Sequence, residues 1–270
     1  MHITFIGGGN MATALIGGLI KQGFKPGNIR VVDVSRENLE SLHSRYQVRT
    51  FAKLDSAAAA SEVIVLAVKP QQLHGVASAL APLLQQQLVI SIAAGVRAGD
   101  LSRWLGGYRQ LVRTMPNTPA MVSSGMTGLY ALPEVLTAQR EQAESVLQAV
   151  GSTLWLEEEN QMDAITAVSG SGPAYVFYFM EAMQAAAVEL GFSPQQARTL
   201  ALETFLGAAK LAAQSDEDAA TLRARVTSKG GTTERALGTM EDAGIKASIV
   251  LAIRAAAERS RELGDALGKE

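Results

Sequence analysis

The sequence predicts an α/β fold, in which an N-terminal Rossmann-type, doubly wound and mainly parallel sheet is followed by an all-α C-terminal domain. Three observations predict it. Apolar strand-like segments alternate with helical segments through the first half, as in βαβ units. A glycine motif, Gly7-x-Gly9-x-x-Ala12, stands between the first strand and the first helix. After Leu156 the patterns are helical, so we place the boundary in the acidic turn 157–159, between domains 1–159 and 160–270.

Five strands are expected in the first domain. The run Val-Ile-Val-Leu-Ala-Val at 63–68 has no polar alternation, which is typical of a parallel strand buried on both faces. Segment 88–92 repeats this pattern. The first helix is expected over 10–21, with Gly23 as its stop. The expected strands are 2–6, 30–34, 62–68, 88–92 and 110–114.

The second domain is expected to consist of long, alanine-rich helices. The motif Ser-Gly-Ser-Gly-Pro at 169–173 leads into the first of them, with Pro173 at its start and Gly191 at its end. A domain of about 110 residues made of long helices often completes its core in a dimer, so we expect a homodimer. The expected helices are 174–190, 194–213, a short helix that starts at Ser215, and 246–263.

Composition narrows the class of protein. The chain has 270 residues, 47% of them hydrophobic, and a net charge of −2, which indicates a globular protein. It lacks the basic patch and the aromatic residues of a nucleic-acid surface. It has no cysteine, which is compatible with a reducing compartment. The N-terminal apolar segment is too short for a membrane span and has no basic leader, so we expect a cytoplasmic protein with no membrane partner.

The glycine motif predicts a dinucleotide site. Its chemistry requires a tight turn, a backbone that a pyrophosphate can approach, and the start of a helix aimed at it. The alternative is a set of packing glycines in an unrelated α/β domain. The end of the second strand leaves the choice of cofactor open: Asp33 is placed to bond a ribose hydroxyl, which favours NAD, whereas Ser35 and Arg36 are placed to receive the 2′-phosphate of NADP. Arg36 as a solvated residue of the next helix is the alternative.

Two further strand ends and one loop point to the same edge of the sheet. Ala67-Val68-Lys69-Pro70 and Ala93-Ala94-Gly95 end their strands where ligands of open α/β folds bind. Lys69 is expected either to face the cofactor or to be solvated. The small residues at 93–95 leave room for a nicotinamide ring. The prolines of 115–119 stiffen a loop that holds Asn117 at the rim, or that forms a purely structural turn.

The segment Val-Thr-Ser-Lys-Gly-Gly-Thr-Thr at 226–233 interrupts the helical half. Gly230 and Gly231 permit tight curvature and close approach by a ligand. Thr232 or Thr233 is expected to cap a helix that resumes at Glu234. Such a turn suits a small carboxylate, because the first amides of a helix lack internal partners. An ordinary helix connection is the alternative.

Four of these motifs together resemble the pyrroline-5-carboxylate reductase family. They are Ala-Val-Lys-Pro at 67–70, Arg-Thr-Met-Pro-Asn-Thr-Pro at 113–119, Ser-Gly-Ser-Gly-Pro-Ala-Tyr at 169–175, and the segment 226–233. The resemblance runs through nearly the whole chain. It implies reduction of 1-pyrroline-5-carboxylate to L-proline with NADPH. Asp33 stands where members more often have a small or uncharged residue, so NADH stays open as the cofactor. The family resemblance also implies that the helical domain binds substrate and interlocks with a second subunit, in dimers that often assemble further as five dimers in a ring.

The resemblance also implies roles for individual residues. The substrate carboxylate is expected on Ser228 and on the amides of Gly230, Gly231 and Thr232, with Thr233 at the ring nitrogen. Lys229 stands where many members have proline. Cofactor contacts are expected at Ile6, Gly7, Gly8, Gly9, Asn10, Met11, Ser35, Ala67, Val68, Lys69, Pro70, Ala93, Ala94 and Gly95.

This chemistry requires no metal, and none is expected. The cofactor carries the hydride, and positioning supplies much of the reduction of the barrier. Thr233 orients the ring nitrogen, while the proton comes from water or from an imine already protonated. Two alternatives are a related β-hydroxyacid or carbonyl reductase and a non-catalytic NAD(P)H sensor. The helix after the 169–173 motif has no lysine before Lys210, which argues against carbonyl reduction.

Overall fold

The structure is a computed structural model that describes residues 1–269. It divides into two compact units: the first joins Met1–Ser171 to the segment that begins at Ala256, and the second is Gly172–Ala255. The boundary between domains 1–159 and 160–270 stays a prediction. Each unit is described by itself.

The first unit is built on an eight-stranded sheet in the order β3-β2-β1-β4-β5-β6-β7-β8. All neighbouring strands are parallel except β6 and β7, so the predicted doubly wound, mainly parallel fold is confirmed. The strands are β1 (Ile3–Ile6), β2 (Ile29–Val32), β3 (Arg49–Phe51), β4 (Val63–Leu66), β5 (Leu88–Ser91), β6 (Leu111–Met115), β7 (Gly125–Ala131) and β8 (Gly151–Trp155).

The five expected strands are present with slightly different ends, whereas β3, β7 and β8 were not predicted. β3 is only three residues long and partly exposed. β7 and β8 both begin with glycine, and β8 alternates between half-buried and exposed positions rather than forming a buried apolar run. These three segments therefore lack the continuous apolar run that predicts a buried parallel strand, and no strong turn motif marks their ends.

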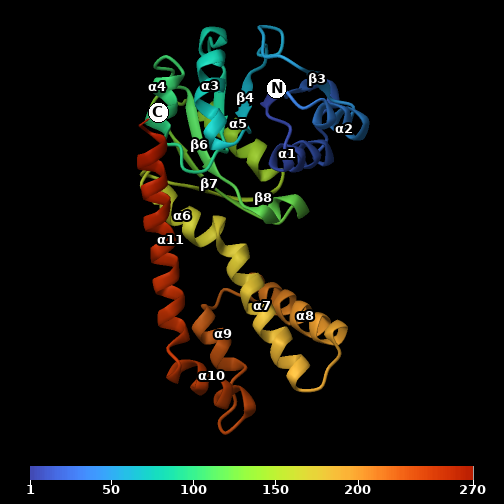
Figure 1. Cartoon of the computed structure of the whole chain (residues 1–270), viewed down its shortest axis with the longest axis vertical. Coiled ribbons are helices and arrows are strands. Elements are labelled where there is room, and N and C mark those ends of the chain that lie inside the picture. The colour runs from blue at the N-terminus through green and yellow to red at the C-terminus, as the bar shows by residue number, and fades with distance from the viewer. Residues whose placement is uncertain (270) are drawn as a thin grey trace. The chain divides into compact units, whose positions relative to one another are not determined.

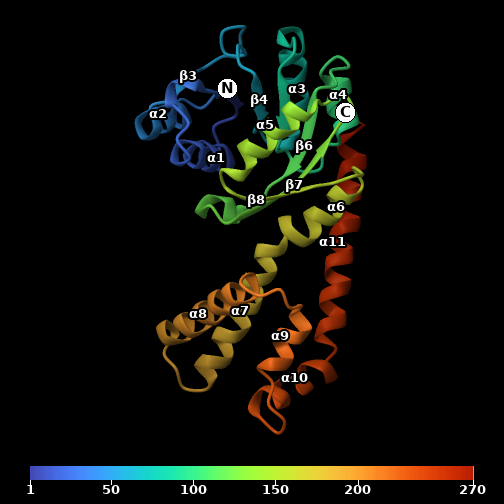
Figure 2. The same cartoon turned by 180° about the vertical axis from the view of Figure 1, so that it is seen from behind.

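Helices cover both faces of the sheet. α1, α2 and α5 pack over one face, on a core that includes Phe5 and Val65. α3 and α4 pack over the other, on a core that includes Ile64 and Leu66. Figure 1 shows α5 behind the sheet, and the opposite view in Figure 2 brings it to the front. These helices are α1 (Asn10–Lys21), α2 (Arg36–Tyr46), α3 (Pro70–Leu80), α4 (Ala98–Trp104) and α5 (Thr137–Gln148).

The second half is helical, as predicted. A π-helical turn over Thr166–Gly170 follows α6, and α7 begins at Gly172, so all of the 169–173 motif except Ser171 is helical. α7 and α8 lie side by side in both views (Figures 1 and 2). The helices are α6 (Gln161–Ile165), α7 (Gly172–Glu189), α8 (Pro194–Ala213), α9 (Ala219–Arg225), α10 (Thr232–Asp242) and α11 (Ile245–Leu267).

Two predicted helix starts were wrong. The short helix begins at Ala219 rather than near Ser215, because the Asp218 carboxylate accepts the Thr221 amide hydrogen bond at 2.7 Å and caps it. α10 begins at Thr232, with Gly231 in the N-cap position instead of a threonine. Among the helices of residues 1–269, none is both long enough and apolar enough to cross a membrane.

Candidate active site

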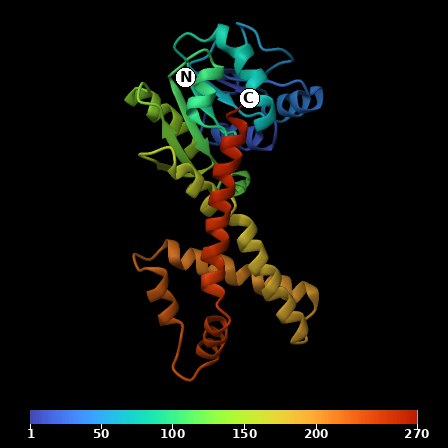
Figure 3. The ribbon, with the colours of Figure 1, turned by 60° about the vertical axis from the view of Figure 1, so that its left-hand side comes forward.

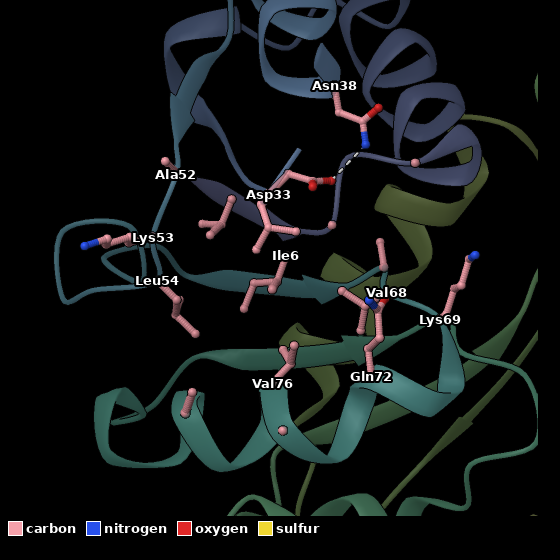
Figure 4. Close-up of a pocket in the computed structure, with 17 residues that line it drawn as sticks. Ile6, Asp33, Asn38, Ala52, Lys53, Leu54, Val68, Lys69, Gln72 and Val76 are labelled. Atoms are coloured by element: carbon pink, nitrogen blue, oxygen red, sulfur yellow. Dashed lines mark hydrogen bonds between the residues drawn. The ribbon is translucent and has the colours of Figure 1, made fainter. Parts of the chain in front are cut away.

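A cavity of the first unit opens where the strand order reverses, between β1 and β4. Its volume is about 580 Å³. The ends of β1, β2 and β4, the connection after β3, and α3 form its walls (Figure 4). Ligands of open α/β sheets bind at this kind of switch point, so the cavity is the candidate dinucleotide site.

Gly7 brings the β1–α1 turn against the end of β4. Its φ of +102° is in the region that favours glycine, and a Cβ at this position would lie 2.4 Å from the carbonyl oxygen of Ala67. The Gly7 amide donates to the Val32 carbonyl oxygen at 2.8 Å, and the Ala67 amide donates to that of Ile6 at 2.7 Å. The turn is therefore fixed by backbone contacts on two sides.

Gly9 is the N-cap of α1 and differs from Gly7 in its surroundings. Its backbone is extended, and a Cβ there would meet nothing within 4 Å in the part of the chain that the structure describes. The first amides of α1 follow directly, and such amides attract phosphate groups. The space at Gly9 therefore fits a pyrophosphate, as the glycine motif predicts.

The Asp33 carboxylate ties the loops of the site together. One oxygen accepts hydrogen bonds from the Gly8 amide at 2.6 Å and from the Asn38 side chain at 3.2 Å, as Figure 4 shows for Asn38. The other accepts the Ser35 amide at 2.7 Å. Asp33 lines the cavity, but its oxygens are engaged by three donors from the glycine turn and the start of α2.

Ser35 and Arg36, the residues considered for a 2′-phosphate, start α2. The Ser35 hydroxyl caps this helix by accepting the Asn38 amide hydrogen bond at 3.3 Å. The Arg36 side chain is 91% exposed and pairs with Glu40 at 2.6 Å along the same helix. Neither side chain is part of the cavity wall.

The structure brings some of the predicted cofactor residues together at the cavity. Its wall includes Ile6, Gly7, Gly9, Ala67, Val68 and Lys69. The wall does not include Gly8, Asn10, Met11, Ser35, Arg36, Pro70, Ala93, Ala94 or Gly95.

The connection after β3 and the accessible side of α3 that faces the cavity were missed. β3 pairs with β2 so that Val32 lies beside Phe51, which carries 52–54 to the same edge as Asp33. The short β-type run at 49–51 was the signal that could have found them. The additional lining residues are Val32, Val34, Asn38, Ala52, Lys53, Leu54, Gln72, Gly75, Val76 and Ala79.

The Asn117 side chain forms hydrogen bonds that connect its loop to two other segments. Its side-chain nitrogen donates to the Ser169 carbonyl oxygen at 3.1 Å, and its side-chain oxygen accepts the Met126 amide hydrogen bond at 2.9 Å. These contacts join the loop after β6 to the π-helical turn and to β7. They favour the structural interpretation of this proline-rich turn.

The glycine turn of the second unit is bordered by a separate cavity of about 440 Å³. Gly230 and Gly231 line it, whereas Ser228, Thr232 and Thr233 do not. The Gly230 amide donates to a carboxylate oxygen of Glu234 at 2.6 Å, and the Gly231 amide donates to the Ser228 carbonyl oxygen at 3.0 Å. Two of the amides expected to hold a substrate carboxylate therefore have partners within the turn.

Sequence comparison decides the family. The chain is 47% identical to pyrroline-5-carboxylate reductase of Pseudomonas aeruginosa over 269 residues, which is 99% of this chain and 98% of that protein. This chain belongs to the pyrroline-5-carboxylate reductase family. Residues 159–263 match the family model for pyrroline-5-carboxylate reductase dimerisation, and residues 2–95 match one described as NADP oxidoreductase coenzyme F420-dependent.

Solved structures agree with this family assignment. A pyrroline-5-carboxylate reductase from Coxiella burnetii has a TM-score of 0.93 at 42% identity, covering 97% of this chain and 98% of that one. Plasmodium falciparum pyrroline carboxylate reductase, solved with NADP bound, has a TM-score of 0.86 at 29% identity, covering 98% of each chain. Within residues 1–269, no group of three or more His, Asp or Glu side chains is arranged to hold a metal ion.

The difference between Gly7 and Gly9 leads to a test of the cavity. We expect Gly9→Ala to weaken NADPH binding at least about tenfold while leaving the melting temperature near that of the wild type, since the added methyl group enters space meant for a phosphate. Titration calorimetry and thermal unfolding measure the two effects. Gly27→Ala, at another open position outside the cavity, is the matched control. Unchanged NADPH affinity in Gly9→Ala would contradict this placement of the pyrophosphate.

Proposed function

We propose that this protein reduces 1-pyrroline-5-carboxylate to L-proline by hydride transfer from NAD(P)H, the last step of proline biosynthesis. The observation that carries the proposal is the match to the reductase family along the whole chain. It is supported by the presence in one chain of a cavity that fits a dinucleotide and a glycine turn that already holds a carboxylate. A cytoplasmic location stays a prediction.

The residues of the first unit fit a dinucleotide. Gly7 allows the backbone to approach the end of β4, and Gly9 leaves open space before the free amides of α1. The apolar walls at Ile6, Val68 and Val76 match the adenine ring. The nicotinamide half is proposed to lie outside this cavity, at the small residues Ala93–Gly95, as the family resemblance implies. When bound, the nicotinamide supplies the hydride. The chain's own residues hold the phosphates, exclude water and orient the ring.

We favour NADPH as the preferred cofactor, with NADH also accepted. The Asp33 carboxylate is engaged by three internal donors, so it is less available to accept a ribose hydroxyl. The guanidinium of Arg36 is held on the surface only by Glu40, and an exposed pair of this kind is weak enough to exchange for a phosphate. The Plasmodium relative with NADP bound supports the same choice.

The glycine turn is proposed to bind the substrate carboxylate. Glu234 supports this proposal, because its carboxylate oxygen accepts the Gly230 amide hydrogen bond at 2.6 Å, and a substrate carboxylate is the same kind of acceptor. The φ of +74° at Gly230 lies in the region that favours glycine. The adjacent amides of Thr232 and Thr233 begin α10 and have no acceptor within the helix. The substrate carboxylate would bind here together with the Ser228 hydroxyl.

Thr233 is proposed to orient the ring nitrogen of the imine. Its hydroxyl is a weak acid, so we assign it hydrogen bonding to the nitrogen and assign the proton to water or to the protonated imine. Catalysis then depends on holding the imine carbon at the nicotinamide face. Well-oriented reactants gain effective molarities of about 10⁵–10⁸ M, so positioning alone supplies a large part of the rate.

The helical region is proposed to form a homodimer, with five dimers assembling into a ring. In residues 172–255, the only buried apolar residues are Ala197 and Ala201. Large apolar side chains there are exposed, including Phe177 at 59%, Tyr178 at 72% and Leu251 at 63%. A surface this apolar is typical of an interface, and the family model that matches 159–263 describes dimerisation.

The reaction is tested with substrates of two classes. We expect oxidation of NADPH with 1-pyrroline-5-carboxylate and none with a 3-oxo acid, and a higher kcat/KM for NADPH than for NADH. A steady-state absorbance assay with each pair measures this. Turnover of the 3-oxo acid alone would indicate a carbonyl reductase, and binding of NADPH without any turnover would indicate a sensor.

The role of Thr233 predicts a selective loss. Thr233→Ala should lower kcat by about 10- to 100-fold through lost orientation of the imine, while the Kd for NADPH stays within about twofold. Thr204→Ala is the matched control, since the Thr204 hydroxyl bonds only the Leu200 carbonyl of its own helix. Equal losses of turnover and NADPH affinity in Thr233→Ala would mean that Thr233 is structural.

The exposed apolar surface predicts the oligomeric state. Light scattering after size-exclusion chromatography should give a mass that is a multiple of two chains, and ten chains for the ring. Phe177→Glu or Leu251→Glu should shift the distribution towards the monomer, because a buried unpaired charge opposes association. A wild-type monomer would contradict the proposed dimer, and a stable dimer of two chains would contradict only the ring.

A further inference from the structure

The C-terminal end of α11 packs against the loop that follows β5. This part of the helix belongs to the first unit, together with the loop. Figure 1 shows the end of the chain beside α4, and Figure 3 shows the same end of α11 at the sheet. The loop contains Ala93–Gly95, which is proposed to face the nicotinamide half of the cofactor.

The helix and the loop approach at two glycines. A Cβ on Gly264 would lie 3.2 Å from the carbonyl oxygen of Gly95, so a larger residue requires the loop to shift. On the loop side, Gly95 has a φ of +79°, and a Cβ there would lie 3.1 Å from a methyl carbon of Leu267. Gly264 is buried in the interior of a helix, where glycine is unfavourable and close approach is its physical use.

Polar contacts hold the same two segments together. Arg97 donates to the Asp265 carboxylate at 2.6 Å and to the Arg261 carbonyl oxygen at 3.5 Å. Arg103 donates to the Gly268 carbonyl oxygen at 2.7 Å. The hydrogen bond from Arg97 is the main cause that lowers the pKa of Asp265, so this pair is charged at neutral pH. Exposed ion pairs contribute little to stability. The close packing of Gly264 on Gly95 is therefore the main contact that holds the loop to α11.

The far end of the loop is fixed independently. The Ala98 amide donates to Glu159 at 2.6 Å, and the same carboxylate oxygen accepts from Arg113 at 2.8 Å. Arg113 is only 5% exposed, so this anchor belongs to the interior of the unit. The segment between Gly95 and Ala98 is therefore held at one end by the sheet and at the other by α11.

We infer that the C-terminal clamp, defined as Gly264, Asp265, Leu267 and Gly268, positions the Ala93–Gly95 loop for hydride transfer. These residues act through the loop and are positioning residues rather than catalytic ones. The inference rests on the proposed function, because it takes the loop as the support of the nicotinamide. The family dimerisation match ends at residue 263, so the clamp lies beyond that matched region.

The test uses substitutions graded by size at Gly264. Gly264→Val should lower kcat with 1-pyrroline-5-carboxylate by about 10- to 100-fold, the effect of displacing a reactant by about 1 Å, and Gly264→Ala should cause a smaller loss. Leu267→Ala, which removes the contact on Gly95, provides the same test if Gly264→Val does not fold. Glu262→Gln is the matched control, since Glu262 pairs with Arg259 on the same helix.

Binding of two probes separates positioning from general damage. Adenosine 2′,5′-bisphosphate occupies only the adenosine half of the site, so its Kd should remain within about twofold in every variant, whereas the Kd for NADPH should rise. Wild-type kcat in Gly264→Val and Leu267→Ala would overturn the inference, as would equal loss of affinity for both probes. Failure of the wild-type protein to reduce 1-pyrroline-5-carboxylate would contradict the proposed function instead.

Discussion

The cofactor site depends on one close backbone contact, between the β1–α1 turn and the end of β4. At Gly7 a single added carbon would lie 2.4 Å from the Ala67 carbonyl oxygen. This contact sets the turn beneath the switch point of the sheet and places the open space of Gly9 before the amides of α1. Asp33 then joins this turn to the start of α2 through hydrogen bonds to the Gly8 and Ser35 amides. The shape of the site therefore follows from backbone geometry more than from charged side chains.

The two strands that form the switch point, β1 and β4, could be predicted from sequence because both are mainly apolar and buried along their whole length. All four residues of Val63–Leu66 are buried. An apolar run of this kind is typical of a parallel strand that is covered on both faces. β3 could not be recognised in this way, since three half-exposed residues pair only with β2. Missing β3 also removed 52–54 from the predicted site. The absence of 52–54 from the predicted site was thus a consequence of missing β3.

At the glycine turn, the sequence predicted the backbone but not the hydrogen bonds. Its glycines and the start of a helix were visible in the sequence, and both are present. The partner of each amide was not visible, because Glu234 was predicted only as the residue at which the helix resumes, whereas its carboxylate accepts the Gly230 amide hydrogen bond. A substrate carboxylate that binds this turn as proposed would replace Glu234 at that amide. The affinity of the turn for substrate would therefore depend on how much more tightly it binds the substrate carboxylate than the carboxylate of Glu234.

The contact between α11 and the loop after β5 could not be predicted, because its residues lie far apart in the sequence. Gly264 resembles any small residue in an alanine-rich helix until the structure brings it to Gly95. Local patterns report which face of a helix is apolar, but not which loop that face supports. For the proposed hydride transfer, the rate depends on how rigidly the two reactants are held. Rigidity comes from backbone packed on backbone, so the glycines that permit such packing at Gly7, Gly95 and Gly264 are as important to this chemistry as the groups that touch the substrate.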